Sequence, residues 1–327
     1  MKTLRYIFFI ILLTAATTYV YSQSWDMFLD KGKEHYDKGN YEKAIENLEL
    51  YLKYETTNPK AEAKQLLEQA KKRLIEQAEE ELNFIENALG LNMKMIYVEG
   101  GTFMMGASSG DSNAWYWETP AHQVTLDSYY IAEFEVTQSQ WKKIMGTTVY
   151  QQRDKEDSSN SIRGVGDNYP MYYVSYEEAR KFCQELSLLT GRTYLLPTEA
   201  QWEFAARGGN KGKNSDNKYS GSYSIDAVAW YDNNSNSSTH PVGQKRANQL
   251  GIYDMSGNVW EWCSDWFGSY SSGSQTNPTG PSSGQYRVLR GGGLSSDAGF
   301  SRISHRRTQY PSHRDSDSGF RVVCIPE

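Results

Sequence analysis

The feature of this sequence that most constrains its fold is an abrupt change of pattern at Gly90. Before it, apolar residues recur every three or four positions within polar stretches, which is the spacing of amphipathic helices. After it, the chain is rich in glycine, tryptophan and tyrosine, and its apolar runs are short. Because the two patterns need different architectures, we expect a small all-α segment over 23–90 and a separate globular domain over 91–327.

The N-terminal segment reads as helix from residue 25 to about residue 88. The pattern predicts helices over 28–38 and 41–54, separated at Gly39-Asn40, and a third helix beyond them. The predicted packing residues are Phe28, Gly32, Gly39, Tyr41, Ala44 and Leu48. This arrangement resembles one tetratricopeptide repeat, which implies a protein partner for the segment. A stalk or docking spacer is the alternative, and we favour it because solenoids usually need three or more repeats.

Residues 91–327 combine short strands with short helices. The residues around 95–98 and 103–106 read as two strands about a turn. Three helices begin at the capping-box pairs Thr137 with Gln140, Ser175 with Glu178 and Thr198 with Gln201, and glycines follow their ends at 146, 191 and 208. No alternation of strands with long helices occurs, so the expected class is α+β with much irregular chain.

Seven motifs follow one another in this domain. They are Gly-Gly-Thr-Phe-Met-Met-Gly at 100–106, Glu-Thr-Pro-Ala-His-Gln-Val at 118–124, Glu-Val-Thr-Gln-Ser-Gln-Trp at 135–141, Leu-Pro-Thr-Glu-Ala-Gln-Trp-Glu-Phe-Ala-Ala-Arg-Gly-Gly at 196–209, Tyr-Asp-Met-Ser-Gly-Asn-Val-Trp-Glu-Trp at 253–262, Arg-Gly-Gly at 290–292 and Gly-Phe-Arg at 319–321. In this order they resemble the sulfatase-modifying, formylglycine-generating enzyme family across about 91–323. The resemblance implies an α+β fold of the C-type-lectin-like kind.

The chemistry of that family is not expected here. Its enzyme oxidises a sulfatase cysteine to formylglycine with two thiols that hold copper, and the matching positions are Ser296 and Ser301. A serine hydroxyl is a hard oxygen with a far higher pKa than a thiol, and it cannot replace a copper thiolate. A related branch binds iron through His-x-x-x-His-x-Glu, but no two histidines of this chain are four apart. We therefore expect no family-type catalytic residues, no copper and no iron.

Two further expectations come from the resemblance. Asp254, Gly257, Val259 and Glu261 match positions at which the family binds a structural calcium ion, and two carboxylates with two backbone carbonyls are hard donors that suit Ca²⁺. The alternative is that Glu261 accepts hydrogen bonds from loop amides. The family's enzyme also bridges cysteines near the positions of Cys183 and Cys324. The second lies two residues further on, which keeps a strand residue on the same face, so we expect this bridge.

The closing segment, residues 290–321, interleaves two classes of residue. The expected framework is Arg290, Gly291, Gly292, Arg302, Ile303, Arg306, Pro311, Arg314, Gly319, Phe320 and Arg321. The expected outward-facing, ligand-binding residues are Ser295, Ser296, Asp297, Phe300, His305, Arg307, Thr308, Tyr310, His313, Asp315, Ser316 and Asp317. The second class offers donors, acceptors, charge and aromatic rings, as recognition surfaces do. It also resembles the variable region of retroelement-diversified ligand-binding proteins that share this fold.

The first residues indicate export. Lys2 and Arg5 precede an apolar run over 6–13 and a small, polar stretch over 15–22, which together form a signal peptide over 1–22. An uncleaved anchor is the alternative, but the run is about half of the roughly 20 residues that span a bilayer. We expect a periplasmic or extracellular chain with no integral membrane segment. The net charge of −6 with no basic block argues against a nucleic-acid partner.

The sequence thus supports two functions. The preferred one is an exported, non-catalytic recognition or assembly module that binds a protein or glycan through 290–321. The alternative is a formylglycine-generating oxidoreductase that acts on a cysteine-containing sulfatase peptide. The absence of thiols at 296 and 301 favours the first.

Overall fold

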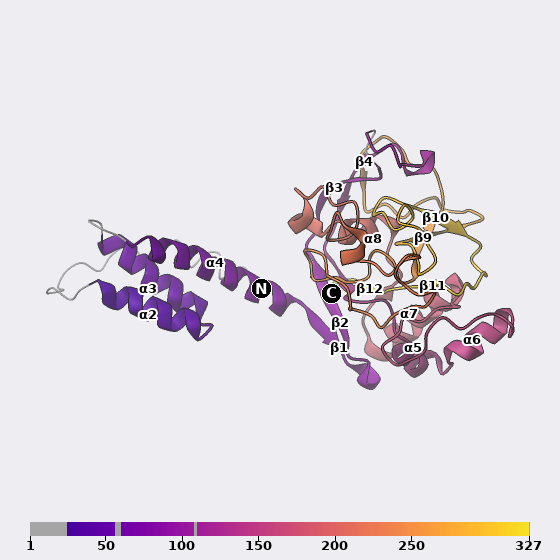
Figure 1. Cartoon of the computed structure of the whole chain (residues 1–327), viewed down its shortest axis with the longest axis horizontal. Helices are drawn as coiled ribbons and strands as arrows, with labels where there is room; N and C mark the ends of the chain where they lie inside the picture. Colours follow the sequence, from indigo (N-terminus) through magenta and orange to yellow (C-terminus); the bar gives the residue numbers. More distant parts are fainter. Residues whose placement is uncertain (1–24, 56–59, 108–109, 327) are drawn as a thin grey trace. The chain divides into compact units, whose positions relative to one another are not determined.

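The computed structural model describes residues 25–55, 60–107 and 110–326, which form two compact units with a boundary between Glu81 and Leu82 (Figure 1). The expected signal peptide lies outside the described residues. Within them, no helix combines the length and the apolar character that crossing a membrane requires.

Among the described residues, three helices come first, and short strands mixed with further helices follow. The helices are α2 (Asp26–Asp37), α3 (Tyr41–Tyr54), α4 (Ala61–Leu82), α5 (Gln138–Met145), α6 (Val149–Glu156), α7 (Tyr176–Thr190) and α8 (Glu199–Ala206). The 3₁₀ turns are η2 (Ala88–Gly90), η3 (Tyr116–Glu118), η4 (Gly209–Gly212) and η5 (Ile225–Ala227). The strands are β1 (Phe84–Glu86), β2 (Met93–Val98), β3 (Gly101–Met105), β4 (His122–Leu126), β5 (Tyr129–Ala132), β6 (Tyr194–Leu195), β7 (Trp260–Trp266), β8 (Gln275–Thr276), β9 (Arg287–Arg290), β10 (Arg307–Gln309), β11 (Ser318–Gly319) and β12 (Val323–Cys324).

The first unit is helical, as expected. Leu29, Leu48 and Tyr51 are buried in its core, together with residues of α4. An added Cβ at Gly32 would lie 2.7 Å from the Leu48 side chain, so the glycine lets α2 and α3 approach closely. Gly32 and Leu48 are two of the packing residues that the sequence predicted for a paired-helix unit. The resemblance to a tetratricopeptide repeat stays a prediction.

The expected helix up to about residue 88 is wrong at its end. Phe84–Glu86 is a strand, β1, whose residues pair antiparallel with Met93–Met95 of β2. Glu86 is buried and accepts a hydrogen bond from the Tyr194 hydroxyl at 2.9 Å. Tertiary pairing therefore overrides the helical spacing of the apolar residues here. The second compact unit accordingly begins at Leu82, before the expected boundary at 90.

Three sheets organise the second unit. Their strand orders are β1-β2-β5-β12-β6, β10-β9-β7-β11 and β3-β4-β8. The five-stranded sheet separates two apolar cores, because neighbouring strand residues point to opposite faces. In β12, Cys324 faces the core that holds Trp141 of α5 and Phe182 of α7, whereas Val323 faces the core that holds Trp202 of α8. Figure 1 shows α5, α6 and α7 together at one end of this unit.

The three predicted capping boxes are present. Thr137, Ser175 and Thr198 each accept a hydrogen bond from a backbone N–H of the first helical turn, at the starts of α5, α7 and α8. A fourth box, Thr148 with Gln151, begins α6. Gly146 and Gly191 end their helices in the left-handed conformation, as predicted.

The expected disulfide is not formed. Cys183 and Cys324 lie in the same apolar core, but both are buried thiols. The Cys324 Sγ contacts the carbonyl oxygen of Ile325 at 3.7 Å. Burial raises the pKa of the Cys183 thiol well above its usual range, which makes it unreactive.

Candidate functional site

The closing segment belongs to one sheet at three places. It begins at the last residue of β9, pairs antiparallel with β9 as β10, and near its end forms β11, which runs parallel to β7. The turn after β9 requires glycine at Gly292, where φ is +80° and an added Cβ would lie 2.6 Å from the Ser301 Oγ. The Arg-Gly-Gly motif thus sets the path of the segment.

Buried ion pairs hold the framework arginines. The pairs are Arg290 with Glu203, Arg302 with Glu118, Arg306 with Glu199, and Arg321 with Glu261. Arg302 shows the geometry: Nη1 and Nη2 donate to the two carboxylate oxygens of Glu118 at 2.8 and 2.7 Å, and the arginine is 1% exposed. Removing one partner of such a pair leaves a buried charge uncompensated, at a cost of roughly 3–5 kcal/mol. The pairs therefore fix the segment to β7, α8 and η3, and the framework prediction is correct for these arginines.

Three residues that were expected to face outward are buried. The Ser296 hydroxyl accepts a hydrogen bond from the Gly293 N–H at 2.9 Å, and the His305 Nδ1 lies 3.0 Å from Glu118. Asp317 packs against Gly293, and burial with the nearby Asp315 raises its pKa to about 6. The outward prediction is wrong for Ser296, His305 and Asp317, because all three side chains are buried in the fold.

The remaining residues form the outer face of the segment. They are Ser295, Asp297, Phe300, Arg307, Thr308, Tyr310, His313, Asp315 and Ser316, which are exposed or half-buried. Tyr310 is 47% exposed, and its ring packs 4.7 Å from that of Tyr286. Phe300 is half-buried and packs against the core, so it is not a purely external ring.

Arg307 organises the charges of the outer face. Its guanidinium lies 5.3 Å from the centre of the Trp260 ring and donates a hydrogen bond to Asp315 at 3.1 Å. His313 lies 3.8 Å from the same carboxylate. Asp317 lies 3.7 Å from the same guanidinium, which is thus held by a ring and two acids while its side chain stays 30% exposed.

An aromatic turn next to the closing segment was missed by the sequence reasoning. In Trp115, Tyr116 and Trp117, the indoles stack at 4.9 Å and Tyr116 is 81% exposed. Arg306 Nη1 donates to the Trp117 carbonyl at 2.9 Å, and the next residue, Glu118, binds Arg302. Three adjacent aromatic residues in a polar stretch were the available signal. The turn thus places further exposed rings beside the closing segment.

The calcium positions are arranged around an arginine. Asp254 and Glu261 both interact with Arg321, and Glu261 binds its guanidinium with both oxygens at 2.6 Å. Gly257 donates its N–H to the Gly291 carbonyl, and Val259 donates to Glu135 at 3.1 Å.

As arranged, these residues do not fit a calcium ion, because Arg321 already binds both oxygens of Glu261 and supplies the positive charge that the metal would otherwise bring. Asp254 Oδ1 is buried without a hydrogen-bond partner among the described residues, and burial raises the pKa of this carboxyl to about 6. No group of three or more histidine, cysteine or acidic residues that could hold a metal occurs within the described part of the chain. The expected calcium site stays untested, and the Arg321–Glu261 pair argues against it.

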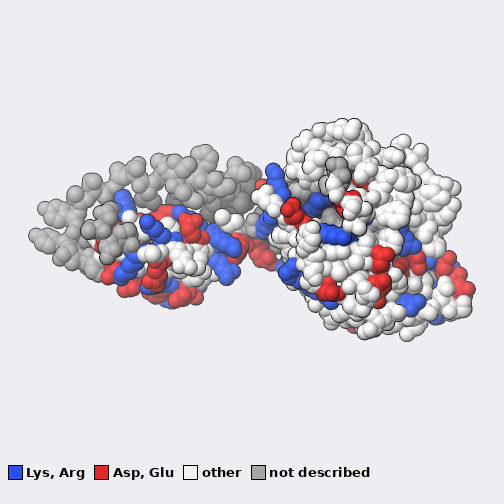
Figure 2. Space-filling model, turned by 45° about the horizontal axis from the view of Figure 1, so that its top comes forward, with Lys and Arg blue, Asp and Glu red and all other residues white. Residues whose placement is uncertain are grey.

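The visible face of the second unit carries mostly uncharged side chains, with basic and acidic residues in small scattered groups (Figure 2). No continuous basic stripe crosses the described residues of that face, whereas nucleic-acid-binding proteins display one.

Comparisons with known proteins cover almost all of this second unit. Residues 83–325 match the sulfatase-modifying factor enzyme 1-like domain. The chain is 34% identical over 274 residues to the chaperone protein LppX of Paenibacillus barcinonensis, covering 70% of this chain and 88% of that protein. It is 28% identical to the formylglycine-generating enzyme of Streptomyces coelicolor, with coverages of 70% and 88%. Among solved structures, Treponema denticola variable protein 1 is similar with a TM-score of 0.66 and 28% identity, covering 75% of this chain and 99% of that one.

Proposed function

The chain belongs to the family of the sulfatase-modifying factor enzyme 1-like domain, and from this premise we propose that it is an exported, non-catalytic recognition module. In this proposal the outer face of residues 290–321 binds a protein or a glycan. The observation that carries it is that Ser296 and Ser301 stand at the family's thiol positions. They lie within 290–321, a segment whose outer residues take no part in the buried ion pairs of the framework arginines.

Both serines are poorly placed for chemistry. Ser296 is 6% exposed and Ser301 is fully buried, and the Ser301 hydroxyl has no hydrogen-bond partner within the described chain. The cysteines offer no substitute, since burial raises the thiol pKa values of Cys183 and Cys263 well above the usual range. A thiol that stays protonated is a weak nucleophile and a poor metal ligand. These facts support a role without thiol oxidation.

The outer face has the composition of a recognition surface. Tyr310, Arg307 and the exposed Tyr116 present rings and a guanidinium, the side chains that most often dominate binding energy at interfaces. Stacked exposed rings also suit the apolar faces of sugars. The buried arginines beneath them keep the backbone in place, so binding costs little ordering of the segment.

The experiment uses the chain without residues 1–22 as bait for a glycan array and for extracts of the producing organism. We expect ligands that bind the wild type and the Lys181→Gln variant, whose exposed change lies on α7, but not the Tyr310→Ala variant. Ligands retained equally by all three proteins would place binding elsewhere and overturn the proposal. Phe320→Ala provides the framework control, because this fully buried ring should be needed for stability first.

The enzymatic alternative has its own assay. The chain is incubated with copper and a peptide that contains Cys-x-Pro-x-Arg, and formylglycine is detected by mass spectrometry. We expect no product. Turnover would refute the non-catalytic proposal, and its loss in Ser301→Ala would locate the chemistry.

Export and diversification complete the proposal. Fusion of residues 1–30 to a reporter that is active only outside the cytoplasm should give activity, and removal of 1–22 should abolish it. The likeness to a protein named variable protein 1 supports a diversified origin for the closing segment. Sequencing this region in many isolates should then find changes concentrated at outer-face positions such as Tyr310, with the framework arginines constant.

A further inference from the structure

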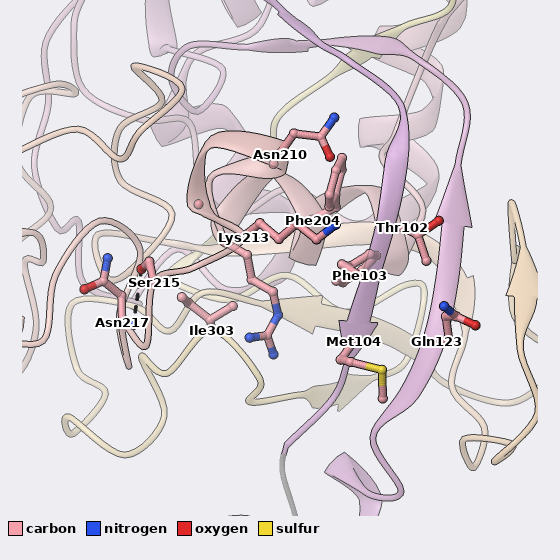
Figure 3. A pocket seen from close by; sticks show the side chains of 13 residues that line it. Thr102, Phe103, Met104, Gln123, Phe204, Asn210, Lys213, Ser215, Asn217 and Ile303 are labelled. Atoms are coloured by element: carbon pink, nitrogen blue, oxygen red, sulfur yellow. Dashed lines mark hydrogen bonds between the residues drawn. The ribbon is translucent and has the colours of Figure 1, made fainter.

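A cavity of about 500 Å³ lies between β3, α8 and η4 and contains none of the outer-face residues (Figure 3). Its apolar lining comes from Phe103, Met104, Phe204 and Ile303. The rings of Phe103 and Phe204 pack with centroids 5.0 Å apart, and Met104 is 55% exposed. This volume lies within the roughly 300–1,000 Å³ of small-molecule pockets.

The charged side chains that line the cavity are both basic. They are Arg207 and Lys213, and no aspartate or glutamate is among the lining residues. The Lys213 ammonium forms no ion pair or hydrogen bond within the described chain, and Figure 3 shows this side chain beside the apolar residues of the pocket.

The positive charge of Arg207 is only partly compensated. Its partner Glu203 also binds the buried Arg290, so one carboxylate serves two guanidinium groups. The Nε and Nη2 atoms of Arg207 are used for Glu203 and the Gly106 carbonyl, while its Nη1 makes no hydrogen bond within the described residues. A site with an apolar lining and two cations at its wall is complementary to an acid with a hydrocarbon body.

We propose that this cavity binds a small carboxylic acid whose apolar body rests on Phe103, Phe204 and Met104. The carboxylate is placed at Lys213 and the Nη1 of Arg207. Asn217 and Ser215 line the same cavity and offer hydrogen bonds to a further polar group of the acid. This site is independent of the recognition function proposed above.

The test uses 4-phenylbutyrate as the probe and 4-phenylbutan-1-ol as its neutral match, with binding to the chain without residues 1–22 measured by calorimetry. We expect the acid to bind more tightly than the alcohol. Equal affinities, or no acid binding at millimolar concentration, would overturn the proposal.

Two substitutions separate the parts of the site. Lys213→Gln should weaken the acid about fivefold, which corresponds to about 1 kcal/mol for a partly exposed ion pair, and should leave the alcohol unchanged. Met104→Ser should weaken both probes to a similar degree. Lys181→Gln makes the same charge change outside the cavity and should change neither.

The outcomes distinguish this site from the outer face. Tyr310→Ala should leave acid binding intact, because that residue does not line the cavity. If Lys213→Gln leaves acid affinity unchanged, or if Tyr310→Ala abolishes it, the assignment of the acid to this cavity is wrong.

Discussion

Replacing Glu118 with glutamine removes the negative charge to which Arg302 and His305 both bind. Glu118 is fully buried, and its carboxylate oxygens accept hydrogen bonds from Arg302 and Ser304, with the His305 ring nitrogen 3.0 Å away. Burial alone would raise the pKa of Glu118, but the hydrogen bonds of His305 and Arg302 outweigh it and lower the pKa to about 2. The substitution would leave the buried Arg302 guanidinium beside a neutral amide, with the half-buried Asp111 at 3.3 Å as its remaining acidic partner.

The size of the effect follows from the pKa. The difference between the ordinary value of 4.5 and the folded value of about 2, at about 1.4 kcal/mol per pKa unit, corresponds to about 3 kcal/mol. Because the pKa is lower in the folded protein, this stability is fully present above pH 4.5. It is lost as the pH falls toward 2, with about 2 kcal/mol gone by pH 3. The variant has no such carboxyl, so the difference in the free energy of unfolding between wild type and variant should shrink as the pH falls below 4.5.

Urea unfolding followed by circular dichroism at pH 7, 4.5 and 3 measures the difference. We expect Glu118→Gln to lower the free energy of unfolding by about 3 kcal/mol at pH 7, within reach of the roughly 3–5 kcal/mol for a broken buried pair. Glu177→Gln is the matched control, because Glu177 pairs with Arg180 on the exposed side of α7 and should cost roughly 0.5 kcal/mol or less. A cost below about 1 kcal/mol, or a gap that stays constant down to pH 3, would refute the reasoning.

Four further results are expected. Tyr310→Ala should change the free energy of unfolding by less than about 0.5 kcal/mol, because the side chain is 47% exposed and belongs to no buried core cluster of the described chain. Thr148→Ala should cost about 1 kcal/mol through loss of the α6 capping box, again measured in urea. Peptide mapping without reductant should find Cys183 and Cys324 as separate thiols, and a bridged peptide would contradict the structure. EGTA should leave the melting temperature unchanged, since Arg321 neutralises Glu261; a drop that Glu261→Gln abolishes would instead establish the calcium site.

Local signals in the sequence predicted local structure well. The capping boxes at Thr137, Ser175 and Thr198 were found because their hydrogen bonds join residues three apart, within one helical turn. The order of the seven motifs predicted the α+β class through its resemblance to a family of that fold. Thr148 with Gln151 has the same spacing and begins α6 in the same way.

Contacts between distant residues could not be predicted from the same patterns. His305 reads as a polar loop residue, yet its partner Glu118 lies 187 positions away in the sequence. Phe84 continues the apolar spacing of the preceding helix, but it pairs with Met95 across a sheet. In both cases the local structure is set by an interaction with a residue that is distant in the sequence and close only in the folded chain. The sequence shows that a charged or an apolar residue requires a partner when it is buried, but it does not show which residue that partner is.

The buried pairs explain how irregular chain can carry a defined surface. The stretch 291–306 contains no helix or strand, and apolar packing is non-directional, so packing alone would not set its path. A guanidinium that binds both oxygens of a carboxylate constrains distance and angle together. The net stability gained from each pair is small, because both charges lose their water, but any path that separates the partners leaves a buried charge unpaired. The buried pairs of Arg302 and Arg306 therefore raise the free energy of other backbone conformations. Outer residues such as Tyr310 make none of these pairs and do not fix the path of the backbone. Such a division of roles lets the outer face change its side chains while the backbone that presents them stays the same.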